Sequence, residues 1–332
     1  MQLLNNNLDE RTSTIKPVEK IRFNVTGEEN PTVRENRIMY LIDTLTEGIY
    51  NIFKSGNKKD KDSYHSVDVI KDYYAEQIKE LNSLLKIDDI TIKYNGNIGL
   101  FFRNKKIGYL SMGNEKLKEN KHAAFVVWSI VGKITCNFKT DVCTLFCYNG
   151  CRETKGNLYG KIHNLILSML DIFEDLMIRV LSAYGQYKNK KLYCRIHEDG
   201  DFYNLEYLQK WRRIAEKMTD QNIKFMAYSK ELVVLQNYSK ISTKNLMFRY
   251  SIVDDTKPEY IEYAQKNNIP TYIVLGDKKV VYGKFNPNNV AHVEYMQFKN
   301  QIASRKDGCV GSCQHCKKCY NDYVKNIFTV VH

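Results

Sequence analysis

The sequence predicts an α/β protein whose sheet forms a partial (β/α) barrel. Residues Ala123–Val131 form a continuous apolar run, which is typical of a strand buried on both faces. From Lys191 to Leu275, segments with strand and helix patterns then alternate. Such alternation predicts parallel strands joined by crossover helices, and therefore an α/β sheet or a partial barrel.

The individual elements follow from the spacing of apolar residues along the chain. A polar arm of about residues 1–37 is expected to precede helices at Ile38–Phe53 and Val67–Leu85. Three short strands come next, at Ile90–Tyr94, Ile98–Phe102 and Ile107–Leu110. A long helix over Leu158–Tyr184 follows the apolar run. The alternating region then contains strands at Lys191–His197, Ile223–Ser229, Leu246–Val253 and Thr271–Leu275, and helices at Leu205–Lys217, Glu231–Tyr238 and Pro258–Asn267.

The composition is that of a globular chain, and the chain divides into three regions. Hydrophobic residues make up 43% of the 332 residues and charged residues 27%, which excludes wholesale disorder. We expect an α+β N-terminal extension over residues 1–120 and a β/α partial barrel over residues 121–300. A cysteine-rich segment over residues 301–332 completes the chain.

Net charge and hydropathy bear on partners and location. The 50 basic residues exceed the 38 acidic ones by twelve, so an anionic partner is favoured, such as an anionic small molecule or nucleic acid. The sequence contains no run of about eighteen apolar residues and no apolar segment of a signal peptide at its start. These features predict a cytoplasmic protein that does not enter a membrane.

Eight of the nine cysteines fall into two tight groups, and the single Cys194 lies between them. Cytosolic thiols stay reduced, so clustered cysteines in such a protein point to metal or iron–sulfur ligation rather than to disulfides. Cys194 lies within a predicted strand, and we expect it to be a small buried side chain.

The first group, Cys136-x6-Cys143-x3-Cys147, follows the apolar strand. A loop at the carboxyl end of the first barrel strand is where α/β enzymes place their chemistry. Three thiolates can hold a 4Fe–4S cluster and leave one iron open to chelate S-adenosylmethionine (SAM). Cys151 lies four residues beyond Cys147, so a closed four-cysteine cluster and a zinc site remain alternatives.

The second group places four thiols within eleven residues, at Cys309, Cys313, Cys316 and Cys319. Structural zinc sites usually consist of two separated knuckles, whereas three consecutive close spacings are more typical of a ferredoxin. An auxiliary 4Fe–4S cluster is therefore favoured, with zinc as the alternative.

Polar residues recur where the predicted parallel strands end. Because side chains alternate along a strand, Arg195 and His197 are expected to face the barrel interior, opposite Leu192, Cys194 and Ile196. The candidate catalytic residues are His197, Asp199, Asp201 and Lys230. The candidate cofactor-binding residues are Asp199, Gly200, Asp201, Ser229 and Arg249. Among these, Lys230 and Arg249 are the candidates for binding anionic groups.

Several motifs together resemble the phage gene product 88 family, which is related to radical-SAM-like iron–sulfur proteins. The resemblance covers roughly residues 110–320 and rests on both cysteine groups, Arg195–Phe202, Glu206-Tyr207 with Trp211, and Phe225–Lys230. It implies a phage or prophage origin and a barrel-type iron–sulfur fold, and it names no reaction or substrate.

Two functions are compatible with these features. The first is a radical-SAM-type enzyme with a catalytic and an auxiliary 4Fe–4S cluster, which requires a reductant of the flavodoxin or ferredoxin type. The second is a basic, non-enzymatic protein, stabilised by zinc or iron–sulfur sites, that binds nucleic acid or a host protein.

Overall fold

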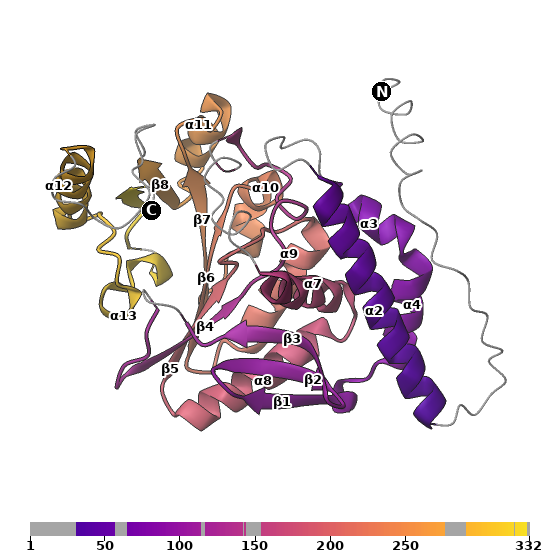
Figure 1. The fold of residues 1–332 in the computed structure, drawn as a ribbon. Helices are drawn as coiled ribbons and strands as arrows, with labels where there is room; N and C mark the ends of the chain where they lie inside the picture. The colour runs from indigo at the N-terminus through magenta and orange to yellow at the C-terminus, as the bar shows by residue number, and fades with distance from the viewer. Residues whose placement is uncertain are drawn as a thin grey trace, which may run out of the picture.

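The structure is a computed structural model that describes residues 31–56, 65–113, 117–141, 143, 154–275, 290–321 and 323–330. These parts of the chain form a mixed α/β fold around one open sheet of nine strands (Figure 1). The strands lie in the sheet in the order in which they occur in the chain. The predicted α/β class is therefore confirmed.

The sheet has an antiparallel and a parallel part. Its antiparallel strands are β1 (Ile90–Tyr94), β2 (Asn97–Phe102) and β3 (Lys105–Ser111), and β3 meets β4 through the single pair Ser111 and Val127. Six parallel strands follow: β4 (Ala123–Trp128), β5 (Lys191–Ile196), β6 (Ile223–Ser229), β7 (Leu246–Ile252), β8 (Thr271–Leu275) and β9 (Asn326–Val330). The sequence patterns did not predict β9.

Helices connect the parallel strands. The N-terminal helices are α2 (Pro31–Ser55), α3 (Val67–Tyr73) and α4 (Ala75–Leu84), followed by the 3₁₀ turn η2 (Ile87–Asp89). The connections between parallel strands contain α7 (Lys155–Met169), α8 (Phe173–Lys188), α9 (Leu205–Lys217), α10 (Leu232–Ile241), α11 (Pro258–Lys266), α12 (Val290–Ser304), α13 (Cys313–Cys316) and η3 (Lys318–Tyr320).

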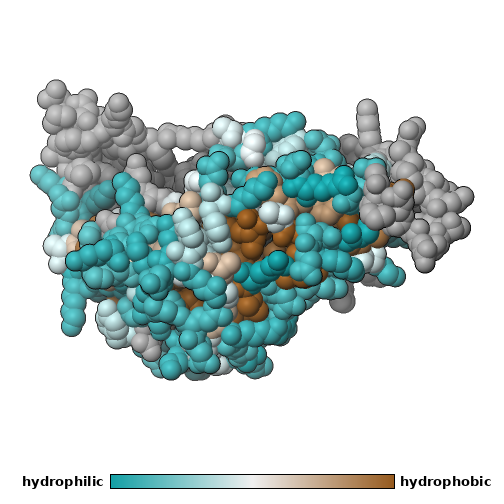
Figure 2. Space-filling view, turned by 90° about the horizontal axis from the view of Figure 1, so that it is seen from below, coloured by the Kyte–Doolittle hydropathy of each residue, from teal (hydrophilic) through white to brown (hydrophobic). Residues whose placement is uncertain are grey.

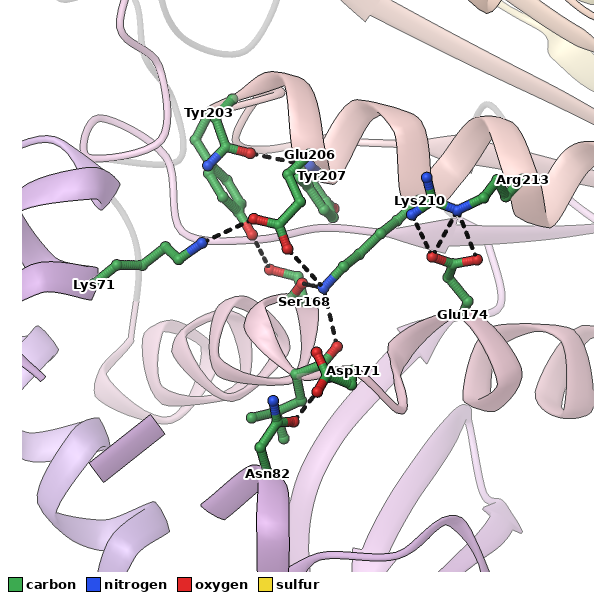
Figure 3. A network of polar contacts seen from close by, with 12 residues as sticks. Lys71, Asn82, Ser168, Asp171, Glu174, Tyr203, Glu206, Tyr207, Lys210 and Arg213 are labelled. Atoms are coloured by element: carbon green, nitrogen blue, oxygen red, sulfur yellow. Dashed lines mark hydrogen bonds and ion pairs between the residues drawn. The ribbon is translucent and has the colours of Figure 1, made fainter. Parts of the chain in front are cut away.

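The long helix predicted over Leu158–Tyr184 is two helices, α7 and α8, separated at residues 170–172. The ammonium group of Lys210 on α9 donates to the carbonyl oxygens of Ser168 (3.2 Å) and Leu170 (3.0 Å), as Figure 3 shows in part. The last carbonyls of a helix have no partner within the helix. Lys210 satisfies them from outside and so stabilises the break. In the same network Arg213 binds Glu174 through two nitrogens, which holds α9 against α8.

Both faces of the parallel sheet are covered. Along β4, Ala124, Val126 and Trp128 belong to the main core with α7, α8 and α9. The alternate residues Phe125 and Val127 belong to a smaller core on the opposite face, whose other buried members are Leu117, Ala123, Tyr193, Met226, Cys319, Tyr320 and Ile327. The segment that carries the second cysteine group therefore packs on the face opposite the helices.

Figure 2 shows one face of the molecule coloured by hydropathy. Hydrophilic residues cover most of the face shown in Figure 2, and apolar residues gather in a band across its middle. In the part of the chain that the structure describes, no helix has the length and the apolar character needed to cross a membrane.

Candidate functional site

The loops that follow β4 and β5 are joined to each other by hydrogen bonds. The Ser129 hydroxyl oxygen accepts the N–H groups of Glu198 (3.2 Å) and Asp199 (3.4 Å), and the Ile130 N–H donates to the Asp199 carbonyl (3.2 Å). Because β4 and β5 are parallel neighbours, both loops leave the same edge of the sheet. The loop that begins the first cysteine group thus lies against the Asp199–Asp201 segment.

Two glycines allow these loops to approach so closely. A Cβ atom on Gly132 would lie 2.4 Å from Asp199 Oδ1, where it would collide. Gly200 has φ of +83°, a backbone conformation that other residues rarely adopt, and a Cβ there would lie 2.9 Å from the Ile130 carbonyl oxygen. Gly200 therefore has a structural role in the joined loops.

The carboxylate of Asp199 forms a buried ion pair. Lys161 on α7 donates to Asp199 Oδ2 at 2.7 Å, and both residues are buried. Asp199 Oδ1 accepts the N–H of Gly200. The sequence analysis missed Lys161, because a lysine on an amphipathic helix carries no signal of burial. Its helical position, which shares a face with buried Leu158 and Leu165, was the only available clue.

The carboxylate of Asp201 receives three hydrogen bonds from two strand ends. Oδ1 accepts from the Ser229 hydroxyl (2.6 Å) and the Phe202 N–H (2.8 Å), and Oδ2 accepts from the Lys230 N–H (3.0 Å). Burial raises the Asp201 pKa, and these bonds act in the opposite direction. The predicted Asp201, Ser229 and Lys230 thus meet, although the Lys230 side chain itself donates to the Ser251 hydroxyl (3.1 Å).

Glu231, which the sequence analysis treated only as the start of a helix, adds another buried carboxyl group. It is 1% exposed, and Oε1 accepts the N–H of Phe138 at 3.1 Å. Burial and the nearby Asp201 raise the Glu231 pKa to about 9, so this carboxyl is protonated at neutral pH. Its place directly after Ser229-Lys230, at a strand end, was the signal in the sequence.

These carboxyl groups surround Cys136, the first cysteine of the first group. Burial raises the Cys136 pKa well above its usual value, and Asp201, Glu231 and Asp199 raise it further. The thiol therefore stays protonated in the unliganded protein. A bound metal cation or cluster supplies the positive charge that deprotonates such a thiol. We term Cys136, Asp199, Asp201 and Glu231 the carboxylate site.

The remaining cysteines of the first group are described only in part. Cys143 is half-buried, and its N–H donates to the Thr140 hydroxyl. Cys147 and Cys151 lie outside the described residues. Within the described ranges, no three His, Cys, Asp or Glu side chains form a group that could hold a metal ion.

His197 does not face the side of the sheet that the strand alternation predicts. Its φ of +64° ends the regular strand, and its ring packs edge-on against Phe202 in the core under α9. The Tyr207 hydroxyl accepts from Trp128 Nε1 (3.0 Å) and lies 2.9 Å from His197 Nε2, to which it can donate. Burial, assisted by Arg195, lowers the His197 pKa to about 3. The expected interior position of His197 is therefore wrong, and the neutral ring lies in the main core.

The four thiols of the second group line one cavity. Cys309, Cys313, Cys316 and Cys319 border it together with Tyr320 and Ile327. Cys313 and Cys316 lie on the single turn α13, and Lys317 in the left-handed conformation ends that turn. The Cys309 N–H donates to the Phe328 carbonyl (2.7 Å), which joins the segment to β9. We term residues 308–321 the C-terminal cysteine segment.

Arg249, predicted to bind a cofactor or an anionic group, instead holds the C-terminal cysteine segment. The side chain is fully buried, and its guanidinium donates to five backbone carbonyl oxygens at 2.7–3.2 Å. These carbonyls belong to Lys318, Cys319, Asn321, Val324 and Lys325. The structure thus gives Arg249 a structural role, and its binding of a cofactor or an anionic group stays a prediction.

The fold and the site define an α/β protein with a thiol-and-carboxylate site at the carboxyl end of its parallel strands. A second group of four cysteines lies on the face of the sheet opposite the helices of the main core. Residues 105–322 match the family model described as gene product 88, so the chain belongs to the phage gene product 88 family. No curated protein and no solved structure matches the chain.

We predict that an H197N variant loses stability in a pH-dependent manner. Asparagine tolerates the positive φ, but it loses the buried ring, so we expect about 2 kcal/mol of destabilisation at pH 7.5. The unfolded chain gains a proton on His197 near pH 6.5, whereas the folded chain does not, so wild-type stability falls below that pH. The difference between the free energies of unfolding of the wild type and H197N should narrow by about 1.4 kcal/mol per pH unit below 6.5. Urea unfolding at pH 7.5 and 5.5 measures it, and an unchanged difference would contradict the buried neutral histidine.

We also predict that R249K releases the C-terminal cysteine segment. Lysine keeps the charge but cannot reach all five carbonyls, and each buried carbonyl left without a donor costs about 1–3 kcal/mol. Trypsin should then cleave near Lys317 and Lys318 much faster than in the wild type, as mass spectrometry of the fragments would show. R179K, which changes an exposed ion pair with Asp88, is the matched control. Equal cleavage in R249K and R179K would refute the holding role.

Proposed function

We propose that this protein is a radical-SAM-like iron–sulfur protein that uses two 4Fe–4S clusters. Cys136, Cys143 and Cys147 would hold the first cluster and leave one iron open for SAM. The C-terminal cysteine segment would hold an auxiliary cluster. The six parallel strands β4–β9 would correspond to the partial barrel of radical-SAM type. The observation that carries this proposal is the position of Cys136 among carboxyl groups at the carboxyl end of β4.

The carboxyl oxygens of the carboxylate site support an occupant that donates hydrogen bonds or carries positive charge. Asp201 accepts hydrogen bonds from a hydroxyl and two backbone N–H groups, which act to lower its pKa against the effect of burial. SAM carries an ammonium and a sulfonium group, and both are cations. The Asp199–Asp201 segment would therefore bind the cofactor, with Lys161 fixing the Asp199 carboxylate. When bound, the reduced cluster supplies the electron that cleaves the sulfonium.

The cavity of the C-terminal cysteine segment fits an auxiliary cluster by its donor set and by one orphaned atom. All four cysteines border the same cavity. The Tyr320 hydroxyl, beside them, is buried and has no hydrogen-bond partner among the described residues. A buried hydroxyl without an acceptor is unfavourable, and thiolate or sulfide sulfur would supply one.

Several further features of the proposal rest on the same chemistry. A small reductant of the flavodoxin or ferredoxin type would deliver the electrons, and the protein would act in the cytoplasm of the host cell. Lys230 and the net positive charge of the chain would attract an anionic substrate. The competing function is a non-enzymatic zinc or iron–sulfur protein that binds nucleic acid or a host protein.

We predict about eight irons per chain after anaerobic reconstitution, together with a brown colour. Addition of dithionite and SAM should release 5′-deoxyadenosine, which chromatography quantifies. A C143A variant should retain about half of the iron and release no 5′-deoxyadenosine.

The matched control is C194A, which removes a thiol that is fully buried in the main core on β5. It should retain both the full iron content and the release of 5′-deoxyadenosine. A colourless protein with two zincs would refute the proposal and favour the non-enzymatic function. Full iron loading without release of 5′-deoxyadenosine would refute SAM cleavage but not the two clusters.

A further inference from the structure

The end of β6 contacts both cysteine sites through two successive residues. Ser229 donates to Asp201 in the carboxylate site, as described above. The preceding residue, Tyr228, donates its hydroxyl hydrogen to Cys319 Sγ at 2.8 Å. This hydrogen bond spans 91 positions in the sequence, and through it a side chain of the sheet contacts a thiol of the C-terminal cysteine segment.

Two neighbouring side chains pack against the Tyr228 ring. The Arg195 guanidinium lies over it at 5.3 Å from the ring centroid, and the Tyr272 ring lies at 4.2 Å, tilted by 36°. A tyrosine hydroxyl is ordinarily protonated at neutral pH, so Tyr228 acts as a hydrogen-bond donor to this sulfur.

Cys319 itself cannot easily move away from this hydroxyl. Its carbonyl oxygen accepts from Arg249 Nε at 3.2 Å, and the residue is 7% exposed. Burial raises the Cys319 pKa to about 12, whereas the Tyr228 bond and the Arg249 charge act to lower it. Donor and acceptor are thus both held by groups outside the cysteine segment, so the hydrogen bond is preorganised.

We propose that Tyr228 tunes the reduction potential of the cluster held by the C-terminal cysteine segment by donating a hydrogen bond to the ligating sulfur of Cys319. This inference rests on the proposed function. Hydrogen bonds to ligand sulfurs stabilise the more negative, reduced state of an iron–sulfur cluster and so raise its potential. Tyr228 is a positioning residue in this proposal, since it acts through Cys319.

The test is a potentiometric titration of the reconstituted full chain, followed by electron paramagnetic resonance. All proteins carry C143A, so that only the auxiliary cluster contributes to the signal. Y228F keeps the ring and removes the donor. Y272F is the matched control, because it removes a neighbouring hydroxyl whose partner is Thr329 rather than a sulfur.

We expect Y228F to hold as much iron as its parent and to show a lower midpoint potential, and Y272F to match the parent. Equal potentials of Y228F and its parent would overturn the inference and leave the proposed function intact. A similar shift in Y272F, or loss of iron from Y228F alone, would also overturn it. Absence of iron from the parent would refute the auxiliary cluster itself, and both proposals would fall.

Discussion

The buried guanidinium of Arg249 determines where the C-terminal part of the chain lies. A guanidinium in the interior requires acceptors for all its N–H groups, and here five carbonyls between Lys318 and Lys325 supply them. That requirement holds the C-terminal cysteine segment on the sheet face opposite the helices and leads the chain directly into β9. The four cysteines line one cavity, and Cys319 accepts a hydrogen bond from Tyr228, because this segment is fixed in that place.

The two cysteine sites differ in their electrostatic surroundings. Three carboxyl groups raise the Cys136 pKa, whereas Arg249 and the Tyr228 hydroxyl act to lower that of Cys319. Hydrogen-bond donors to a ligating sulfur favour the addition of an electron. On the proposed function, the auxiliary cluster would therefore be the easier of the two to reduce. That order suits a first cluster that transfers an electron to SAM and an auxiliary cluster that does not.

Local patterns in the sequence predicted most of the strands. The clearest pattern is the continuous apolar run of β4, which is buried on both faces. They missed β9 (Asn326–Val330), which lies outside the alternating region and pairs with β8 far away in the sequence. The break between α7 and α8 was missed for a similar reason, because Lys210 supports it from another helix. In the site, Asp201 lies close to Ser229 and Lys230 because the parallel neighbours β5 and β6 end at the same edge of the sheet. The burial of Lys161 and the positive φ of His197 were missed, because neither has a local signature in the sequence.

On the proposed function, two separate groups of thiols would hold iron on one sheet, and one iron would remain open to SAM. Mössbauer spectroscopy of the full chain, reconstituted with ⁵⁷Fe and recorded with and without SAM, measures this most directly. We expect the signal of two 4Fe–4S clusters, with about one iron in eight changing its parameters when SAM is added. Spectra that SAM leaves unchanged, or a chain that takes up no iron, would contradict it.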